Sequence, residues 1–118
     1  MLQIRKKQMF IFKKYMLKQY EDRIQKHLHR RFPKKCNVLG ERGVRETICD
    51  GIQRSETYGV VSESDVQRYI EWMIMLGPRF DMDSKTAWAG EILRNKKLKG
   101  FEKMDRIDSY AIVMRSEQ

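Results

Sequence analysis

The sequence predicts an all-α protein, a single compact bundle of four to five helices with a long basic N-terminal helix. Two observations carry this prediction. Apolar side chains recur every three or four residues along most of the 118-residue chain, which is the period of an amphipathic helix. No segment shows the sustained alternation of apolar and polar residues that marks a strand, and no Asn-Gly pair marks a hairpin turn.

The first predicted helix covers about 4–32, within which residues 5–32 contain neither Gly nor Pro. Lys and Arg fill much of the surface that its apolar stripe leaves, so this helix is both amphipathic and basic. We expect it to end before Pro33, because proline disfavours a helical conformation in the preceding residue, and we expect 33–40 to be a loop. The stripe consists of Phe10, Leu17, Tyr20, Ile24, Leu28 and Phe32.

The second predicted helix covers about 43–58. Val44, Ile48 and Ile52 fall near one of its faces. Gly51 weakens this prediction, since an interior glycine costs a helix about 1 kcal/mol relative to alanine. Gly59 is placed to end the helix with a left-handed cap.

The third predicted helix, about 62–76, has the clearest start in the chain. Ser62 and Asp65 have the spacing of a capping box, in which a hydroxyl caps the helix and an acid three residues later reaches back. Gly77-Pro78 has the glycine and following proline that typically end a helix. Because the stretch after Glu71 is almost wholly apolar, we expect this helix at the centre of the fold.

Two shorter helices complete the predicted bundle, about 85–95 and about 101–115. Asp83 or Ser84 is expected to cap the first of them, and Trp88 and Phe80 are expected to pack where the chain turns after Pro78. Lys96 to Gly100 reads as a polar turn. The apolar positions that define the two helices are Trp88, Ala89, Ile92, Leu93, Phe101, Met104, Ile107, Tyr110 and Met114.

Composition excludes several classes of protein. Apolar residues make up 41% of the chain and charged residues 35%, which indicates a soluble globular chain with an unusually charged surface. The longest apolar runs, Met9–Phe12 and Trp72–Leu76, are far shorter than the roughly 20 residues of a membrane span. The opening residues lack the apolar core and cleavage site of a signal peptide. We therefore expect a cytoplasmic protein with no membrane span and reduced cysteines.

Positive charge is concentrated at one end of the chain. The formal net charge is +9, yet residues 1–35 carry 12 Lys or Arg against two acids, and residues 36–118 carry 13 against 14. A nearly neutral body with one strongly basic element suggests a negatively charged partner. An acidic protein and nucleic acid both fit that description. An anionic membrane surface fits less well, because the apolar face of the first helix is needed for the core.

Catalytic and metal-binding patterns are weak. His27 and His29 are two residues apart on a predicted helix and so point in different directions, and Cys36 and Cys49 lack the spacing of a zinc pair. Asp81-x-Asp83 resembles the opening of a calcium loop, but the sixth and twelfth positions are Thr86 and Ile92 instead of Gly and Glu. No phosphate-binding glycine loop or nucleophile signature occurs. We therefore expect no metal, no cofactor and no enzymatic activity.

Several strings, taken together, resemble a family of small bacterial proteins encoded beside type VI secretion spike components and polymorphic toxin effectors. This chain departs from the family pattern at Arg79, where an acid is favoured, and in its more basic first helix. The resemblance implies an accessory role as an adaptor, chaperone or immunity partner, and it implies no catalytic residue. The strings are Ile4–Phe10, Gly43-Val-Arg-Glu46, Ile52, Tyr58-Gly59, Asp65-Val66, Tyr69, Met75-Leu-Gly-Pro-Arg-Phe-Asp81, Trp88-Ala-Gly-Glu-Ile-Leu93 and Lys103-Met-Asp-Arg-Ile107.

These observations lead us to expect a non-enzymatic protein-binding factor that associates with a secreted effector or spike protein through an acidic surface of that partner. The alternative is a non-specific nucleic-acid-binding protein that uses the same basic helix. Self-association through the long helix stays open. The expected partner-binding residues are Lys6, Lys7, Phe12, Lys13, Lys14, Met16, Lys18, Arg23, Lys26, Arg30 and Arg31.

Overall fold

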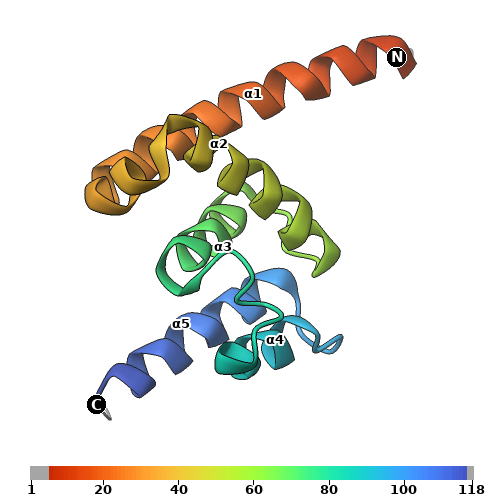
Figure 1. The fold of residues 1–118 in the computed structure, drawn as a ribbon. Coiled ribbons are helices and arrows are strands. Elements are labelled where there is room, and N and C mark those ends of the chain that lie inside the picture. Colours follow the sequence, from red (N-terminus) through yellow and green to blue (C-terminus); the bar gives the residue numbers. More distant parts are fainter. Residues whose placement is uncertain (1–5, 117–118) are drawn as a thin grey trace. The chain divides into compact units, whose positions relative to one another are not determined.

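The computed structural model describes the backbone of residues 6–116 and the side chains of residues 16–114. These residues contain helices and no strand, so the predicted all-α fold with five helices is confirmed. No helix within them is both long and apolar enough to cross a membrane. The elements, drawn in Figure 1, are α1 (Lys6–Arg31), α2 (Pro33–Thr57), α3 (Glu63–Leu76), the 3₁₀ helix η1 (Ser84–Thr86), α4 (Ala87–Leu93) and α5 (Gly100–Ser116).

The chain divides into two compact units, Met1–Arg45 and Glu46–Gln118. The first contains α1 and the start of α2, and the second contains the rest of α2 with α3, η1, α4 and α5. The prediction that the whole chain forms one domain stays a prediction.

In the first unit the apolar stripe of α1 is exposed at Leu17, partly buried at Tyr20 and buried farther along the helix. Ile24 and Leu28 are buried, as are Cys36 and Val44 on α2. Ile24 and Leu28 are four residues apart and so lie one above the other on the same side of the helix. Burial raises the pKa of the Cys36 thiol, because a low-dielectric surrounding disfavours the thiolate.

The predicted loop over 33–40 is wrong, because this segment is helical. The amide of Phe32 donates to the Leu28 carbonyl at 2.7 Å and the amide of Cys36 donates to the Phe32 carbonyl at 2.9 Å, so hydrogen bonding resumes at once. Pro33 opens α2, and proline suits the first position of a helix because its missing N–H has no partner there. The break comes later, at Gly40, whose φ of 75° and ψ of 166° are non-helical.

The second unit is organised around α3, as the apolar run after Glu71 predicts. Val66, Tyr69, Ile70, Met73 and Ile74 of this helix are all buried. Gly51, which weakened the prediction of the second helix, is required at this position for a steric reason. A Cβ on Gly51 would lie 2.5 Å from Ile70 Cγ1 and 2.9 Å from Met73 Sδ, so only glycine lets α2 approach α3 this closely.

The predicted caps of these helices are confirmed. The one difference is that the Asp65 carboxylate accepts from the Ser62 side chain, whereas in a capping box the acid accepts from the N-cap backbone amide. Ser62 is the N-cap of α3, and its Oγ accepts from the Asp65 amide at 3.2 Å. The Asp65 carboxylate accepts from the Ser62 hydroxyl at 2.7 Å, which ties the two cap residues together. Gly59 has the left-handed φ of 76° that was expected of a helix-ending glycine.

The fourth predicted helix is divided into two pieces. Asp83 caps η1, since its Oδ1 accepts from the Lys85 amide at 2.9 Å. Helix α4 then contacts α5, where the ring of Trp88 stacks on Tyr110 with a centroid separation of 4.6 Å. Phe80 is buried elsewhere, with its ring 5.0 Å from Tyr69. Trp88 therefore packs on the last helix, and Phe80 packs on α3.

Candidate functional site

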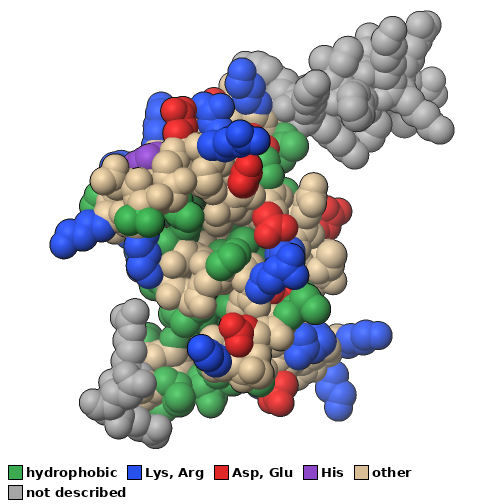
Figure 2. All heavy atoms as spheres, viewed as in Figure 1, with side chains coloured by type: hydrophobic (Ala, Val, Ile, Leu, Met, Phe, Trp, Pro, Cys, Tyr) green, Lys and Arg blue, Asp and Glu red, His purple; other side chains and the backbone are tan. Residues whose placement is uncertain are grey.

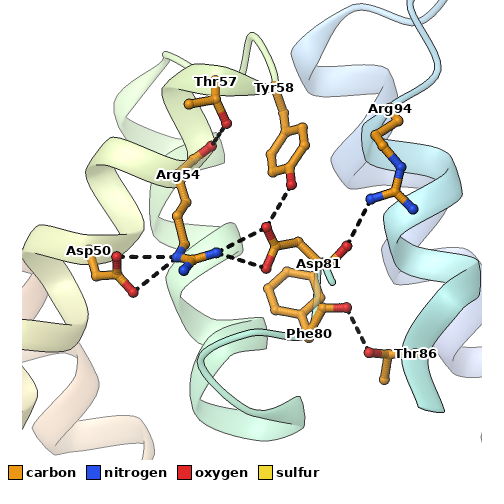
Figure 3. Close-up of polar contacts among 8 residues, drawn as sticks. All are labelled: Asp50, Arg54, Thr57, Tyr58, Phe80, Asp81, Thr86 and Arg94. Atoms are coloured by element: carbon orange, nitrogen blue, oxygen red, sulfur yellow. Dashed lines mark hydrogen bonds and ion pairs between the residues drawn. The ribbon is translucent and has the colours of Figure 1, made fainter. Parts of the chain in front are cut away.

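A buried carboxylate joins three elements of the second unit, as Figure 3 shows. Asp81 lies in the turn after α3, and its side chain is 2% exposed. Both of its carboxylate oxygens accept from Arg54 Nη1 of α2, at 3.2 and 3.3 Å. Tyr58, which follows α2, donates its hydroxyl to Oδ2 at 2.6 Å. We call Asp50, Arg54, Tyr58, Tyr69, Asp81 and Arg94 the Asp81 cluster.

The donors to Asp81 are themselves held in place. Arg54 Nε donates to both carboxylate oxygens of Asp50, one helical turn earlier, at 3.1 and 3.2 Å. Arg94, just after α4, donates from Nη1 to the backbone carbonyl of Asp81 at 3.1 Å. Thr86 donates its hydroxyl to the neighbouring Phe80 carbonyl at 2.6 Å. The turn around Asp81 is therefore tied to α2 on one side and to η1 and α4 on the other (Figure 3).

The electrostatics of the cluster keep its donors protonated. Burial raises the pKa of Tyr58 to about 12, and the hydrogen bond and negative charge of Asp81 act in the same direction. Burial opposes the charge of Arg54, but the carboxylates of Asp81 and Asp50 outweigh it, so the pKa of that guanidinium is raised. Tyr58 therefore acts as a hydrogen-bond donor near pH 7, and it is poorly suited to be a general base.

Tyr69 is the one member of the Asp81 cluster whose polar group lacks a partner. Its side chain is fully buried, and its hydroxyl has no hydrogen-bond partner among the described residues. Burial raises its pKa, and the negative charge of Asp81 raises it further. The ring lies 6.3 Å from that of Tyr58 and 5.0 Å from that of Phe80, so Tyr69 serves mainly as an apolar body between the two.

This geometry supports a structural role for the Asp81 cluster. The carboxylate is enclosed, and it already accepts three hydrogen bonds from side chains of its own chain. Asp83, two residues away, caps η1 and belongs to a different set of contacts. Among the described residues, no group of three or more His, Cys, Asp or Glu side chains is arranged to hold a metal ion.

A second polar cluster is centred on Arg68 of α3, and its central group is a donor instead of an acceptor. Here one guanidinium donates to three carboxylates: to Asp65 at 3.0 Å, and to Asp105 and Asp108 of α5 at 2.7 Å each. Trp72 donates its indole N–H to the other oxygen of Asp108 at 2.7 Å. Burial opposes the charge of Arg68, but the hydrogen bonds to Asp108 and Asp105 raise its pKa. The Arg68 cluster therefore fastens α3 to α5.

Lys103 supplies a further buried contact between α5 and the end of α2. Its side chain is buried, and its Nζ donates to the Tyr58 carbonyl at 2.7 Å. A cation at the C-terminal end of a helix complements the helix dipole and satisfies a carbonyl that has no partner within the helix. Burial lowers the pKa of this ammonium group.

The predicted partner-binding residues lie on α1. The side chains of Lys6, Lys7, Phe12, Lys13 and Lys14 are outside the residues whose side chains are described. The other six predicted residues are all exposed: Met16, Lys18, Arg23, Lys26, Arg30 and Arg31.

The exposed cations of α1 divide between its faces. A helix turns about 100° per residue, which places Lys26 and Arg30 on the side opposite the buried pair Ile24 and Leu28, with Lys18 at the edge of that side. A shallow hollow on this side is lined by Lys26 and Arg30 together with Asp22, Gln25 and His29. We call Lys18, Asp22, Gln25, Lys26, His29 and Arg30 the outer face of α1. Arg31 lies toward the buried side, and Arg23 lies beside Arg30 at the edge of this face. Both interact within the chain.

The second unit also has a locally positive surface, although the net charge of residues 36–118 is close to zero. The loop between α4 and α5 exposes Arg94, Lys96, Lys97 and Lys99 within six residues. Figure 2 shows blue side chains gathered at this loop. Acids elsewhere in the unit, such as those around Arg68, balance these cations in the net charge of residues 36–118.

Sequence reasoning identified the exposed helix and missed the residues that form the clusters. The contacts of Arg54 with Asp81, of Arg68 with Asp108 and of Lys103 with Tyr58 gave no local signal, because the two residues of each pair are 27 to 45 residues apart in the sequence. Tyr58 and Asp81 are part of the strings that carry the family resemblance, and this was the one sequence signal that pointed to them. Both cysteines are free thiols, Cys36 buried and Cys49 exposed. No protein-family model, curated protein or solved structure matches this chain.

Proposed function

We propose that this chain is a non-enzymatic protein-binding factor that uses the outer face of α1 to dock on an acidic surface of a partner protein. The observation that carries the proposal is the exposure of Lys26 and Arg30 on the side of α1 opposite the buried Ile24 and Leu28, with the exposed Lys18 at the edge of that side. A helix whose apolar side is already covered has its charged side available for a partner.

The chemistry of this face suits a carboxylate-rich surface. Lys and Arg present long apolar stems beneath charged heads, so they can cover apolar surface and pair with acids at the same time. Opposite charges across an interface speed association and fix orientation more than they add affinity. Met16 and Leu17, which are 44% and 43% exposed, provide apolar contact area directly before Lys18, the first of the described cations.

The partner we propose is a secreted effector or spike protein of a bacterial type VI secretion or toxin system, with this chain as its adaptor, chaperone or immunity partner. Support comes from the family resemblance of the strings named above. In the structure, several of those residues have structural roles. Asp81 and Tyr58 belong to the buried cluster, and Asp65 is hydrogen-bonded to Ser62, the N-cap of α3. Binding is therefore assigned to α1, outside this scaffold.

A protein partner is favoured over nucleic acid by the residues around the cations. Sequence-tolerant binding to single strands uses exposed aromatic side chains beside the basic groups, and the outer face of α1 contains no Phe, Tyr or Trp. This face also includes Asp22, an acid that would repel phosphates.

The test is affinity capture from the organism that produces the chain, followed by titration of the purified partner. We expect one specific protein whose binding weakens as salt rises, because exposed charges are screened. A short DNA duplex serves as the competing probe. If the chain shifts the duplex at low salt, with a steep loss of affinity as salt rises, and retains no specific protein, the proposal is wrong.

A further inference from the structure

A depression between α4 and α5 presents an unusual surface on the second unit. Its volume is about 480 Å³, and it is lined by Ile92 of α4 and by Asp105, Arg106, Ser109, Tyr110 and Val113 of α5. The α5 residues fall at spacings of three and four, which places them along one side of the helix. This volume lies within the range of roughly 300–1,000 Å³ typical of ligand pockets.

The walls of this depression are fixed by contacts already described. Tyr110 is held by its stacking on Trp88, with 20° between the ring planes. The charge of Asp105 is offset by Arg68, whose Nη2 lies 2.7 Å from its carboxylate. Arg106 is exposed and supplies the positive charge of the lining. The depression is therefore a preformed apolar surface with a cation on its wall.

Apolar side chains are dense on the adjoining turn of α5. Tyr110 is 41% exposed, Ile112 68%, Val113 53% and Met114 39%. Of these four, Tyr110 and Val113 line the depression, so its wall is itself an exposed apolar surface of the kind found at interaction sites. We call the depression and this turn the α4–α5 groove.

Positive charge begins where the groove ends. The cationic loop that exposes Arg94, Lys96, Lys97 and Lys99 starts two residues after Ile92, which lines the groove. Together with Arg106, these residues give the apolar groove a strongly cationic end.

We propose that the α4–α5 groove binds an amphipathic, acidic α-helix of a partner protein. Apolar residues of that helix, at spacings of three, four and seven, would cover Ile92, Tyr110 and Val113. Carboxylates beside them would pair with Arg106 and with the cationic loop. This surface is separate from the outer face of α1, so it adds a second binding site to the proposed function and does not depend on it.

Charge favours this occupant over two others. A second copy of the chain, docked through the same groove, would bring two Arg106 side chains and two cationic loops close together, and like charges oppose such a contact. A nucleic-acid duplex matches the charge, but its phosphate backbone offers nothing apolar to cover Ile92, Tyr110 and Val113.

The experiment is a display selection on the full-length chain. A library of random peptides of about 15 residues, long enough to form a helix, is selected on the wild-type protein. Binders are depleted on a Val113→Asp variant. We expect enriched sequences with acidic residues and with apolar residues at spacings of three and four. Enrichment of basic or unpatterned sequences, or no enrichment, would overturn the proposal.

The selected peptide is then titrated by fluorescence anisotropy against variants. We expect Val113→Asp and Arg106→Glu each to weaken binding about ten-fold or more, which corresponds to about 1.4 kcal/mol. Val61→Asp, at an exposed valine outside the groove, is the matched control and should bind normally. Circular dichroism checks that each variant folds. Equal loss in all three variants, or a wild-type dimer that Val113→Asp dissociates, would count against this assignment.

Discussion

The Asp81 cluster and the outer face of α1 use the same kinds of charged residue for opposite purposes. In the cluster, Asp81 is enclosed and its oxygens accept hydrogen bonds from Arg54 and Tyr58 of the same chain. On α1, Lys18, Lys26 and Arg30 are exposed. A buried charge without its partner is costly, whereas an exposed one is solvated by water. Changes in the cluster should therefore reduce stability, and changes on α1 should reduce binding.

The largest loss of stability is expected from Asp81→Asn. The substitution keeps the size of the side chain but leaves the Arg54 guanidinium without its buried counter-charge. Breaking a buried pair from one side costs about 3–5 kcal/mol, and we expect the lower end because Arg54 is 21% exposed. Urea unfolding followed by circular dichroism measures the change. Asp83→Asn, on an exposed cap, is the control and should change stability by less than about 1 kcal/mol.

Arg68→Ala should have a smaller effect, because the Arg68 cluster is partly exposed. Removing this guanidinium leaves Asp65, Asp105 and Asp108 without their common donor. Asp105 and Asp108 are 64% and 39% exposed and can be solvated by water. We expect a loss of about 1.5 kcal/mol in unfolding free energy. If Arg68→Ala loses as much unfolding free energy as Asp81→Asn, burial does not determine which cluster contributes more to stability.

Two Tyr→Phe substitutions separate a satisfied hydroxyl from an unsatisfied one. Tyr58→Phe removes a 2.6 Å hydrogen bond to Asp81 and should cost about 1 kcal/mol. Tyr69→Phe removes a buried hydroxyl without a partner among the described residues, so stability should stay the same or increase. Thermal unfolding of the two variants tests the difference. Greater destabilisation by Tyr69→Phe would show that its hydroxyl is bonded in solution.

Alkaline pH should reduce the stability of the fold through the ionisation of Tyr58. The pKa of Tyr58 is raised from 10.0 to about 12, so the folded chain holds this proton more tightly than the unfolded chain. Its contribution is complete below about pH 10 and is lost as the pH rises toward 12. Lys103 acts in the opposite direction, since its folded pKa is lowered. The Tyr58→Phe variant should therefore show a shallower loss of stability over this range than the wild type, measured by urea unfolding.

The sequence predicted the helices well because helices depend on local signals. The period of apolar residues and the cap at Ser62 lie within a few residues of the element that they define, and both predictions are confirmed. The segment after Pro33 failed because proline both ends one helix and begins another, and the sequence does not say which role applies.

The buried clusters could not be predicted from local patterns. Asp81 stands in a turn and read as part of a weak calcium motif, and its partner Arg54 lies 27 residues earlier. Only the packing of α2 and α3, which Gly51 allows, brings the two together. The predicted cations of α1 whose side chains are described are exposed, but the sequence did not distinguish the outer face from Arg23 and Arg31, which interact within the chain.

The most direct test of the account is the affinity of the captured partner for a Lys18→Glu/Lys26→Glu variant, measured at about 150 mM salt. An Arg79→Glu/Lys85→Glu variant, with the same change of net charge at exposed positions of the second unit, is the matched control. We predict that the α1 variant loses about ten-fold or more in affinity, with unchanged helicity and unfolding midpoint, and that the control binds normally. Normal binding by the α1 variant, or equal loss in both, would contradict the assignment of binding to the outer face of α1.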